Sequence, residues 1–461
     1  MNESTTKATK HFTGCASLAA LGVKLRQLDV FGPIRKTVQI AQKAVKHTPI
    51  DKLYDAFISL LAGAHGLVEI NTRLRADPAL QTAFGRSTCA EQSVVQQTLD
   101  SCTAENVRQM EQALDTIYRQ HSQGYRHPYA TQYQILDVDM SGMPCGKKAA
   151  FASKGYFAKQ RNRRGRQLGR VLASRYEEVV TDRLFEGTTQ LTKALQPLLE
   201  AAEQTLELDE RKRARTLVRV DAGGGSVDDV NWLLSRGYQV HCKDYSSSRA
   251  QRLAASVQYW VDDPHVPGRQ VGWVYLPAPE YVRPVQRIAV RCRKANGQWG
   301  IGVLISTLSP VEVLTLTQVT TGPDTDPATV LLAYVYFYDQ RGGAAETSFK
   351  GDQQGLGSTK RSKKRFEAQQ MVMLLGTLAH NVVIWARQWL TEAAAPSKLR
   401  HYGILRMVRD VFHVSGFLVL DASCHIVQIV LNQAAPLAPI LVDSLQVLLA
   451  PTHIAINSGE T

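Results

Sequence analysis

Hydrophobic positions follow a helical spacing over roughly the first 125 residues. TPIDKLYDAFISLLAGAHGLVEINTRL (48–74) and TAENVRQMEQALDTIYRQHS (103–122) both place apolar residues three and four apart, which predicts amphipathic helices. Thr103 is suited to cap the second helix, with Glu105 in its first turn. A shorter helix is predicted over AEQSVVQQTLDS (90–101), so the pair forms either a helix-turn-helix or part of a plain helical bundle.

At Tyr133 alternation replaces the helical spacing. YQILDVDMSG (133–142) predicts a strand that ends in acids, and GRVLASRYEEVVTDRLFEG (169–187) predicts two further strands. A helix over 189–208, a strand in RTLVRVDAGGG (215–225), a helix over 226–237 and a strand over 238–245 follow. Ser226 is suited to cap that second helix, with Asp229 in the capping-box position. Three strands and then helix, strand, helix, strand predict an α/β fold in which parallel strands pack against helices.

The next region, Val261 to Thr307, is β-rich and interrupts this pattern like an insertion. RIAVRCRKANGQWGIGVLIST (287–307) is the clearest hairpin, with Asn296-Gly297 as its turn. Helices are then predicted over 328–340, from near Glu346 after a break at Gly342-Gly343, and over 366–390. The tail holds a hairpin-like pair, FLVLDA (417–422) and HIVQIVLN (425–432), followed by LVDSLQVLLA (441–450).

Charge narrows the range of partners. The chain has 461 residues, an apolar fraction of 44%, a net charge of +13 and a pI near 9.4. A folded chain with this charge favours an anionic partner, of which nucleic acid is the commonest large one, against the alternative of a merely cationic surface.

Cysteine spacing and apolar runs bear on location. The seven cysteines stand singly, and their odd number excludes a complete disulfide framework, so a reducing cytosol fits best and no zinc spacing is present. The N-terminus, MNESTTKATKHFTG, lacks an apolar signal core. The longest apolar run, 371–386, is shorter than the roughly 20 residues that span a bilayer. We therefore expect a core helix there and no membrane role.

Two acids close predicted strands. Asp139 lies in LDVDMSG and Asp221 in VRVDAGGG, and each is either a cap for the following turn or a ligand at the edge of the sheet. If the first and fourth strands are neighbours, the two carboxylates end side by side, and a divalent cation would relieve their repulsion. Asp137 competes with Asp139 for the first position, which Asp139 fits better because it stands nearer the strand end.

A third carboxylate would complete a metal site. Glu346 stands between an Arg-Gly turn and a cluster of basic residues; Asp339 and Asp352 compete with it, although a solvated charge suits both better. Three carboxylates would hold two Mg²⁺ ions about 4 Å apart, which activate a water or hydroxyl for in-line attack on a phosphodiester. DAGGGS (221–226) lacks the Lys-Ser/Thr of a P-loop, so its glycines are better explained by a sharp turn.

With these residues in this order, the chain resembles the DDE transposases of bacterial insertion sequences. The closest resemblance is to the cut-and-paste branch, whose domain is often called the group 1 DDE domain, and KGYFAKQRNRRGRQLGRVLA (154–173) and RGGAAETSFKGDQQGLG (341–357) match it best. The resemblance runs from roughly Asp77 to Leu431. It implies an RNase H-like core, shared with retroviral integrases: a mixed sheet with helices on both faces, interrupted by a β-rich insertion and preceded by an N-terminal helical domain.

The resemblance also assigns roles to residues. Asp139, Asp221 and Glu346 would be the catalytic metal ligands for two Mg²⁺ ions, for which Mn²⁺ can substitute. The family's Tyr-x-x-Arg-x-x-x-Glu signature corresponds to Tyr338, Arg341 and Glu346, with four residues rather than three between the arginine and the glutamate. Tyr338, with core packing as its alternative, and Arg341 would contact the DNA backbone. The family's lysine has no match at the expected Gln353, and Lys350 could take its place.

Basic and aromatic residues suggest further DNA contacts. Predicted contacts lie before the second strand and after the Glu346 helix: Lys154, Lys159, Arg161, Arg163, Arg164, Arg166, Lys360, Arg361, Lys363 and Lys364. Arg170 extends the first group, Tyr156 and Phe157 are interleaved with it, and Arg365 ends the second. Trp273 and Trp299 lie in the β-rich region, where a related aromatic would stack on a flipped base; a place in the sheet core is the alternative.

Together these features predict a transposase that binds the terminal inverted repeats of its element, and target DNA, as a homodimer on double-stranded DNA in the bacterial cytoplasm near the nucleoid. The alternatives are a stand-alone metal-dependent nuclease and a DNA-binding protein derived from a transposase. The expected domains are a helical DNA-binding or dimerisation region (1–125), the core in two parts (126–260 and 308–395), the insertion (261–307) and a small α/β region (396–461).

Overall fold

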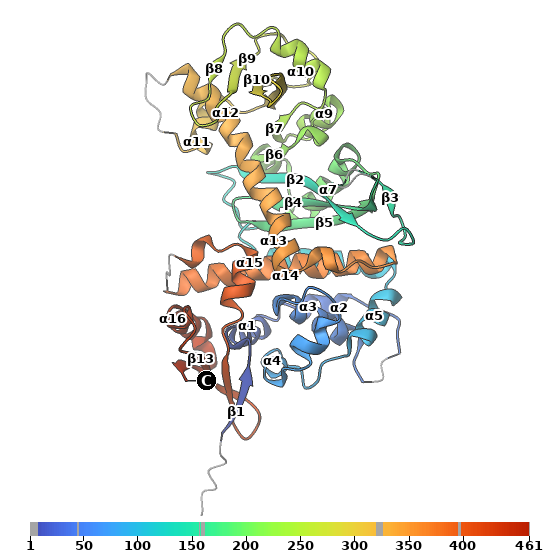
Figure 1. Cartoon of the computed structure of the whole chain (residues 1–461), viewed down its shortest axis with the longest axis vertical. Helices are drawn as coiled ribbons and strands as arrows, with labels where there is room; N and C mark the ends of the chain where they lie inside the picture. Colours follow the sequence, from blue (N-terminus) through green and yellow to red (C-terminus); the bar gives the residue numbers. More distant parts are fainter. Residues whose placement is uncertain are drawn as a thin grey trace, which may run out of the picture. The chain divides into compact units, whose positions relative to one another are not determined.

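The computed structural model describes residues 8–43, 46–155, 157, 162–319, 326–394 and 398–460. The chain forms two compact units (Figure 1). Unit 1 consists of Met1–Ser122, Pro144–Ala152 and Ser348–Thr461, and unit 2 of Gln123–Met143 and Ser153–Thr347. The sequence-based division differs from this one, because it placed residues up to 395 with the core and set 396–461 apart.

Unit 1 is mainly helical around one long central helix. This helix, α14 (Phe366–Ala394), was expected over 366–390, and it packs against α3, α5, α6 and α16. Its apolar side chains, among them Leu375, Leu378 and Trp385, are buried in the core of the unit, as predicted for the longest apolar run. The other helices are α1 (Ala16–Gln27), α2 (Gly32–Thr37), α3 (Pro49–Leu61), α4 (Pro78–Ala83), α5 (Gln92–Ser101), α6 (Ala104–His121), α15 (Ile404–Arg406) and α16 (Ala438–Leu449).

Two details of the predicted helical pattern are corrected. The helix expected over 48–74 ends at Leu61, where Gly63 takes a φ of +69° that a side chain would disfavour, and a π-helical turn, η1 (Ile70–Leu74), follows. The N-terminal segment also contains a strand, β1 (Thr9–Thr13), which pairs antiparallel with β12 (Gly416–Leu420). The expected tail hairpin of β12 and β13 (Ile426–Asn432) is confirmed, and β14 (Ala455–Gly459) completes the sheet order β1-β12-β13-β14.

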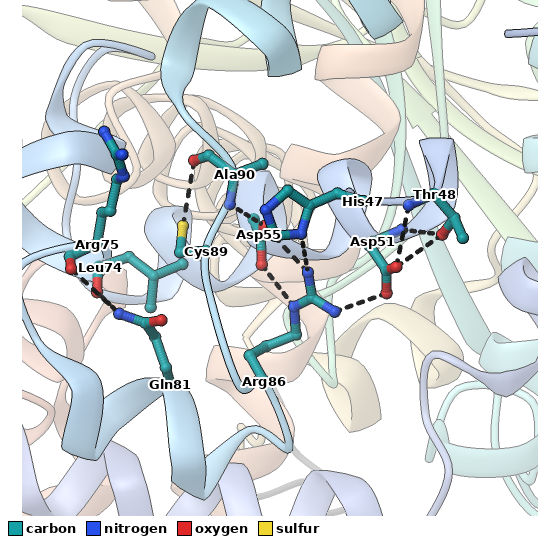
Figure 2. A network of polar contacts seen from close by, with 10 residues as sticks. All are labelled: His47, Thr48, Asp51, Asp55, Leu74, Arg75, Gln81, Arg86, Cys89 and Ala90. Carbon is teal, nitrogen blue, oxygen red and sulfur yellow. Dashed lines mark hydrogen bonds and ion pairs between the residues drawn. The ribbon is translucent and has the colours of Figure 1, made fainter. Parts of the chain in front are cut away.

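An arginine ties together the start of α3 and the loop before α5 (Figure 2). The guanidinium of Arg86 donates from Nη1 to Asp51 at 2.7 Å and from Nε to Asp55 at 2.8 Å. Asp55 is fully buried and also accepts from the backbone N–H of Ala90 at 2.8 Å. Asp51 in addition forms the capping box of α3 with Thr48. A buried carboxylate is costly unless it is paired, so this set of bonds explains how α3 carries an acid on its buried face.

Unit 2 is built on one large twisted sheet. Its strand order is β3-β4-β2-β6-β7-β11-β10-β9-β8, with β5 paired to β4. Pairing is parallel between β2, β6 and β7 and antiparallel between β4 and β5. The strands are β2 (Gln134–Pro144), β3 (Ser153–Lys154), β4 (Arg164–Ala173), β5 (Glu178–Glu186), β6 (Thr216–Val220), β7 (Gln239–Lys243), β8 (Val261–Asp262), β9 (Arg269–Trp273), β10 (Gln286–Arg293) and β11 (Trp299–Ser306).

The β-rich region extends this sheet. The hairpin of β10 and β11 is confirmed, and Gly297 in its turn has a φ of +78°. β11 pairs antiparallel with β7, so the sheet runs on without interruption where the sequence suggested an insertion that breaks the pattern.

Helices cover both faces of the sheet. Alternate residues of β10 and β11 face opposite sides: Ala289 and Val303 pack with α10, whereas Ile288 and Leu304 pack with α12. On strands β4 and β5 lies α7. The helices are α7 (Leu191–Leu206), α8 (Glu210–Ala214), α9 (Val227–Ser235), α10 (Ser247–Ala254), α11 (Pro310–Leu316) and α12 (Pro327–Arg341). The predicted α/β class is therefore confirmed, and among the described helices none is long and apolar enough to cross a bilayer.

The cap of α6 offers a test of unit 1. Thr103 and Asn106 form a reciprocal capping box, so Thr103→Ala should lower the free energy of unfolding by about 1 kcal/mol. Thr116→Ala is the matched control, since Thr116 is exposed in the middle of the same helix and alanine is the better helix former there. Chemical denaturation of both variants measures the difference, and equal stability of the two would contradict the capping role.

Candidate active site

The two strand-end acids lie beside each other at the carboxyl ends of two neighbouring parallel strands, β2 and β6. The pairing of β2 with β6 ends at Val138 opposite Val220, and Asp139 and Asp221 are the next residues of the two strands. Neighbouring strands are about 4.8 Å apart, so the two carboxylates begin from adjacent positions. β2 itself continues to Pro144, which corrects the expectation that the strand stops at Asp139; only its pairing with β6 stops there.

Asp139 is held by its own strand and by α12. Its Oδ1 accepts from the backbone N–H of Met140 at 2.7 Å, and its Oδ2 accepts from Nη1 of Arg341 at 3.1 Å. Burial and the charge of Asp221 raise the pKa of Asp139, although the Arg341 guanidinium opposes the shift. The native protein thus disfavours the charged form of this carboxyl.

Asp221 takes the first of the two roles considered for a strand-end acid, that of a cap for the following turn, and its role as a metal ligand stays a prediction. Its Oδ1 accepts from the backbone N–H of Gly223 at 2.8 Å and so caps the short turn Ala222–Gly224. Gly225 follows, and a Cβ there would lie 1.9 Å from the carbonyl oxygen of Lys243. This close approach of two backbones accounts for a glycine at that position.

The helix above these acids does not break where the sequence predicted. α12 ends at Arg341 and continues directly as a π-helical turn, η3 (Gly342–Glu346), before α13 (Thr347–Gly355). A π-turn joins residue i to residue i+5 and holds one residue more than an α-turn. The extra residue between Arg341 and Glu346 is absorbed in this way, so the two residues stand about one turn apart, with Arg341 buried and Glu346 exposed.

Arg341 is the cation of the site. Its side chain is 8% exposed, and its Nε is buried without a hydrogen-bond partner in the described part of the protein. Burial lowers the pKa of Arg341, but the charge of Asp139 and its neighbours outweighs burial and the net shift is upward. Burial raises the pKa of Tyr338 to about 12, and the Arg341 guanidinium lies 5.8 Å from the Tyr338 ring centroid. Tyr338 also packs against the core under α12, so its contact with DNA stays a prediction.

The competing acids are engaged elsewhere. Asp137 is fully buried in a two-bond ion pair with Arg219. Asp339 accepts from Nη1 of Arg269 at 2.6 Å. Asp352 is buried and bonded to Nδ1 of His380 at 2.7 Å, which corrects the expectation of a solvated charge.

The donor set fits a divalent cation in part. Asp139 and Asp221 supply two oxygen ligands in adjacent positions, which is the ligand type that Mg²⁺ takes. Glu346 is exposed on η3, a turn that packs against β4 beside β2. Within the described ranges, however, no three such side chains converge closely enough to hold a metal ion. The structure thus brings together Asp139, Asp221 and Arg341, whereas Glu346 stands about one turn further along the helix and is exposed.

The predicted basic contacts divide into exposed and buried groups. Arg166 is 1% exposed within β4, a strand that begins earlier than expected and is covered on both faces. Arg361 donates to the carbonyl oxygens of Ala64 and Leu356, and Lys363 donates to Gln96. Burial lowers the pKa of Arg361 to about 10 and that of Lys363 to about 8. These three cations are therefore corrected from DNA contacts to interior residues.

The remaining basic residues keep their predicted accessibility where they are described. The exposed ones are Lys154, Arg163, Arg164, Lys350, Lys360 and Lys364. Lys159, Arg161 and Tyr156 lie outside the described residues. Arg170, which extends the first group, is buried in an ion pair with Asp182.

The two tryptophans differ in their surroundings. Trp273 is half-buried and meets the ring of Tyr334 edge-on at 5.5 Å within the core under α12. Trp299 is flanked by the guanidiniums of Arg291 and Arg293 at 4.6 and 5.6 Å. Trp273 thus follows the alternative of a sheet-core residue, whereas base stacking by Trp299 stays a prediction.

Comparison with known proteins gives likenesses in structure but none in sequence. No protein-family model and no curated protein sequence matches the chain. A cryo-EM structure of a piggyBac transposase synaptic complex with hairpin DNA is similar over 88% of this chain and 82% of that one, with 12% identity and a TM-score of 0.48. At that level the likeness assigns no function, and only the residues of this chain bear on its chemistry.

Two buried polar residues under α12, Arg219 and His241, escaped the sequence analysis, and Asp137 entered it only as a competing metal ligand. Arg219 and His241, like Asp137, each interrupt an apolar strand: LVRVD, VHCK and LDVD. A polar residue at the same step of three strands that pair with one another is the signal that could have revealed them.

The raised pKa of Asp139 leads to a stability test. Asp139→Asn should make the metal-free protein more stable near neutral pH, because the native state disfavours the charged carboxyl. Below the unfolded pKa of about 3.9 the advantage is absent; as pH rises, the unfolded carboxyl ionises first and the wild type loses stability relative to the variant. Denaturation between about pH 4 and about pH 8 measures this gap. Asp228→Asn, at an exposed acid of α9, is the control, and a gap for Asp139→Asn that stays constant with pH would contradict a raised pKa as its cause.

Proposed function

We propose that this protein is a DDE-type transposase that cleaves DNA at the inverted repeats of its element and joins the freed ends to target DNA. The observation that carries the proposal is the adjacency of Asp139 and Asp221, with Arg341 bonded to the first and Glu346 one π-turn further along the same helix. Paired carboxylates next to a buried arginine suit a reaction in which a metal ion and a phosphate group meet.

The strand order supports an RNase H-like core within the proposal. In the order β5-β4-β2-β6-β7, the first three strands of the core are neighbours, and the two later strands continue the sheet in parallel. Ligand sites in open α/β sheets lie at the carboxyl ends of parallel strands, which is where Asp139 and Asp221 stand.

Three carboxylates would hold the metal in this proposal. Asp139 and Asp221 are its first two ligands, and Glu346 is assigned as the third because it stands one π-turn after Arg341, on a turn that packs against β4. Bound Mg²⁺ or Mn²⁺ would supply Lewis-acid stabilisation and an activated water for attack on the phosphodiester.

The other residues bind and orient the DNA. The buried Nε of Arg341 has a hydrogen to donate, and a non-bridging phosphate oxygen is the acceptor that it suits. Tyr338, stacked near the guanidinium, would keep Arg341 directed at the acids. The exposed cations Lys154, Arg163, Arg164, Lys350, Lys360 and Lys364, with the net charge of +13, would contact the backbone of double-stranded DNA. We further propose a homodimer on DNA, in the bacterial cytoplasm at the nucleoid.

Cleavage and joining of labelled DNA test the function. A fragment that carries the inverted repeat flanking the gene should be nicked at its 3′ end in Mg²⁺ or Mn²⁺ and then joined to a target. Asp139→Ala, Asp221→Ala and Glu346→Ala should each slow nicking by at least about a hundredfold while DNA binding persists. Asp339→Ala is the control, because Asp339 is bonded to Arg269 and should be dispensable.

Other outcomes of this assay point to other functions. Cleavage without joining would identify a stand-alone nuclease. DNA binding by the intact protein without any metal-dependent cleavage would identify a binding protein derived from a transposase, and either result would reject the proposal.

The π-turn gives a separate prediction. Deleting Gly343 should convert η3 into an α-turn and leave Arg341 and Glu346 four apart, still on one face, so nicking should be retained. An added Cβ at Gly342 or Gly343 would meet no atom within 4 Å, so neither glycine is required by close packing at its own position. Inserting an alanine after Gly343 should abolish nicking, because it rotates Glu346 off that face. Loss of nicking in the deletion variant with DNA binding intact would contradict this role of the turn.

A further inference from the structure

A row of three polar residues lies beneath α12, one step before the acids. The strand registers set Asp137 opposite Arg219, and Arg219 opposite His241, across β2, β6 and β7. All three face α12, and their exposed fractions are 0%, 2% and 0%. Asp139 and Asp221 stand two residues beyond Asp137 and Arg219, hence on the same face of the sheet.

Arg219 links the sheet to the helix backbone. Its Nε and Nη2 donate to the two oxygens of Asp137 at 2.7 and 2.8 Å, and the hydroxyl of Ser174 donates to the same carboxylate. With this charge compensated, Nη1 donates to the carbonyl oxygen of Phe337 at 2.8 Å. The guanidinium also lies 4.7 Å from the Phe337 ring centroid.

His241 makes the same kind of bond one turn earlier. Its Nε2 lies 3.0 Å from the carbonyl oxygen of Tyr334, and a carbonyl only accepts, so Nε2 carries the hydrogen. Burial lowers the pKa of His241 to about 3, which keeps the ring neutral. The ring also contacts Phe337 and Tyr338, at centroid distances of 5.2 and 6.1 Å.

Two such bonds define how α12 sits on the sheet. The carbonyls of Tyr334 and Phe337 are three residues apart and so lie on one face of the helix. Fixing both prevents the helix from sliding and from rotating about its axis. The next turn carries Arg341, which reaches Asp139, and the π-turn then carries Glu346.

We propose that Asp137, Arg219 and His241 are positioning residues that set the register of α12 and so direct Arg341 and Glu346 toward Asp139 and Asp221. The catalytic consequence rests on the proposed function, whereas the positioning itself does not. Burying an ion pair is expensive, and apolar residues of similar size often stabilise a core as well. The bonds to the helix carbonyls give this pair a role beyond stability.

Hydrogen exchange tests the positioning without any assay of DNA chemistry. Arg219→Lys keeps the charge that compensates Asp137, but one ammonium group does not reproduce three directed bonds. Amides of residues 334–346 should exchange roughly tenfold faster in this variant, while those of β6 are unchanged. Arg170→Lys is the matched control, since Arg170 forms an equally buried two-bond pair with Asp182 that joins β4 to β5.

A second pair of variants covers the case in which Arg219→Lys does not fold. His241→Leu removes the donor to Tyr334, whereas the amide of His241→Gln can replace it, so only the leucine variant should loosen 334–346. Unchanged exchange of this segment in both Arg219→Lys and His241→Leu would overturn the inference. An equal rise in Arg170→Lys would also overturn it, because the effect would then be one of general stability.

The nicking assay connects the inference to function. In Arg219→Lys the single-turnover rate should fall at least about tenfold with DNA affinity unchanged, since only the approach of Arg341 and Glu346 is altered. If the wild type does not nick DNA, the proposed function fails while hydrogen exchange still decides the positioning. If the wild type nicks DNA and both variants exchange like it, the positioning fails alone.

Discussion

The buried ion pair between Asp137 and Arg219 is the interaction on which the arrangement around α12 depends. It places a full charge of each sign in the interior of unit 2, and that is tolerable only because every strong donor has an acceptor within reach. One of those acceptors is the backbone of α12. This helix also packs through apolar side chains and bonds through side chains such as Asp339 to Arg269, and the ion pair adds a directional attachment of its backbone to the strands that carry the acids.

At the carboxyl ends of the strands, one step beyond this ion pair, the polar groups are less fully paired. In the first row, the carboxylate and the guanidinium are paired and the imidazole is bonded through Nε2, although its Nδ1 has no partner among the described residues. In the second row, Asp139 and Asp221 start from adjacent positions, and Arg341 bonds to Asp139. The unmatched donor on Arg341 and the disfavoured charge on Asp139 both belong to this second row. An active site requires both features: side chains held rigidly from beneath, and polar groups that still lack partners where a substrate binds.

Sequence reasoning succeeded where short-range pattern decides structure. Thr103 and Ser226 cap helices as expected, the Asn296-Gly297 hairpin forms, and the run from 371 to 386 is buried. It failed where the outcome depends on distant partners. Arg166, Arg361 and Lys363 look like surface charges in the sequence, and only the fold places them in the interior. The segment of β1 forms a strand because it pairs with β12, which is distant in the sequence. At the site, the adjacent positions of Asp139 and Asp221 could be predicted from the ends of their strands. The row of Asp137, Arg219 and His241 under α12 could be recognised only from the pairing register of the strands.

The π-turn at Gly342–Glu346 bears on how spaced sequence motifs are searched for in genomes. A motif written as fixed intervals assumes that every helix has the same number of residues per turn. One turn that holds an extra residue lets a signature residue move along the chain by one place while it keeps its direction in space. A pair of glycines, which allows the wider turn at little steric cost, is a sequence feature that can indicate such a turn. Searches that allow one optional residue beside a Gly-Gly pair would therefore recover relatives that a strict spacing discards.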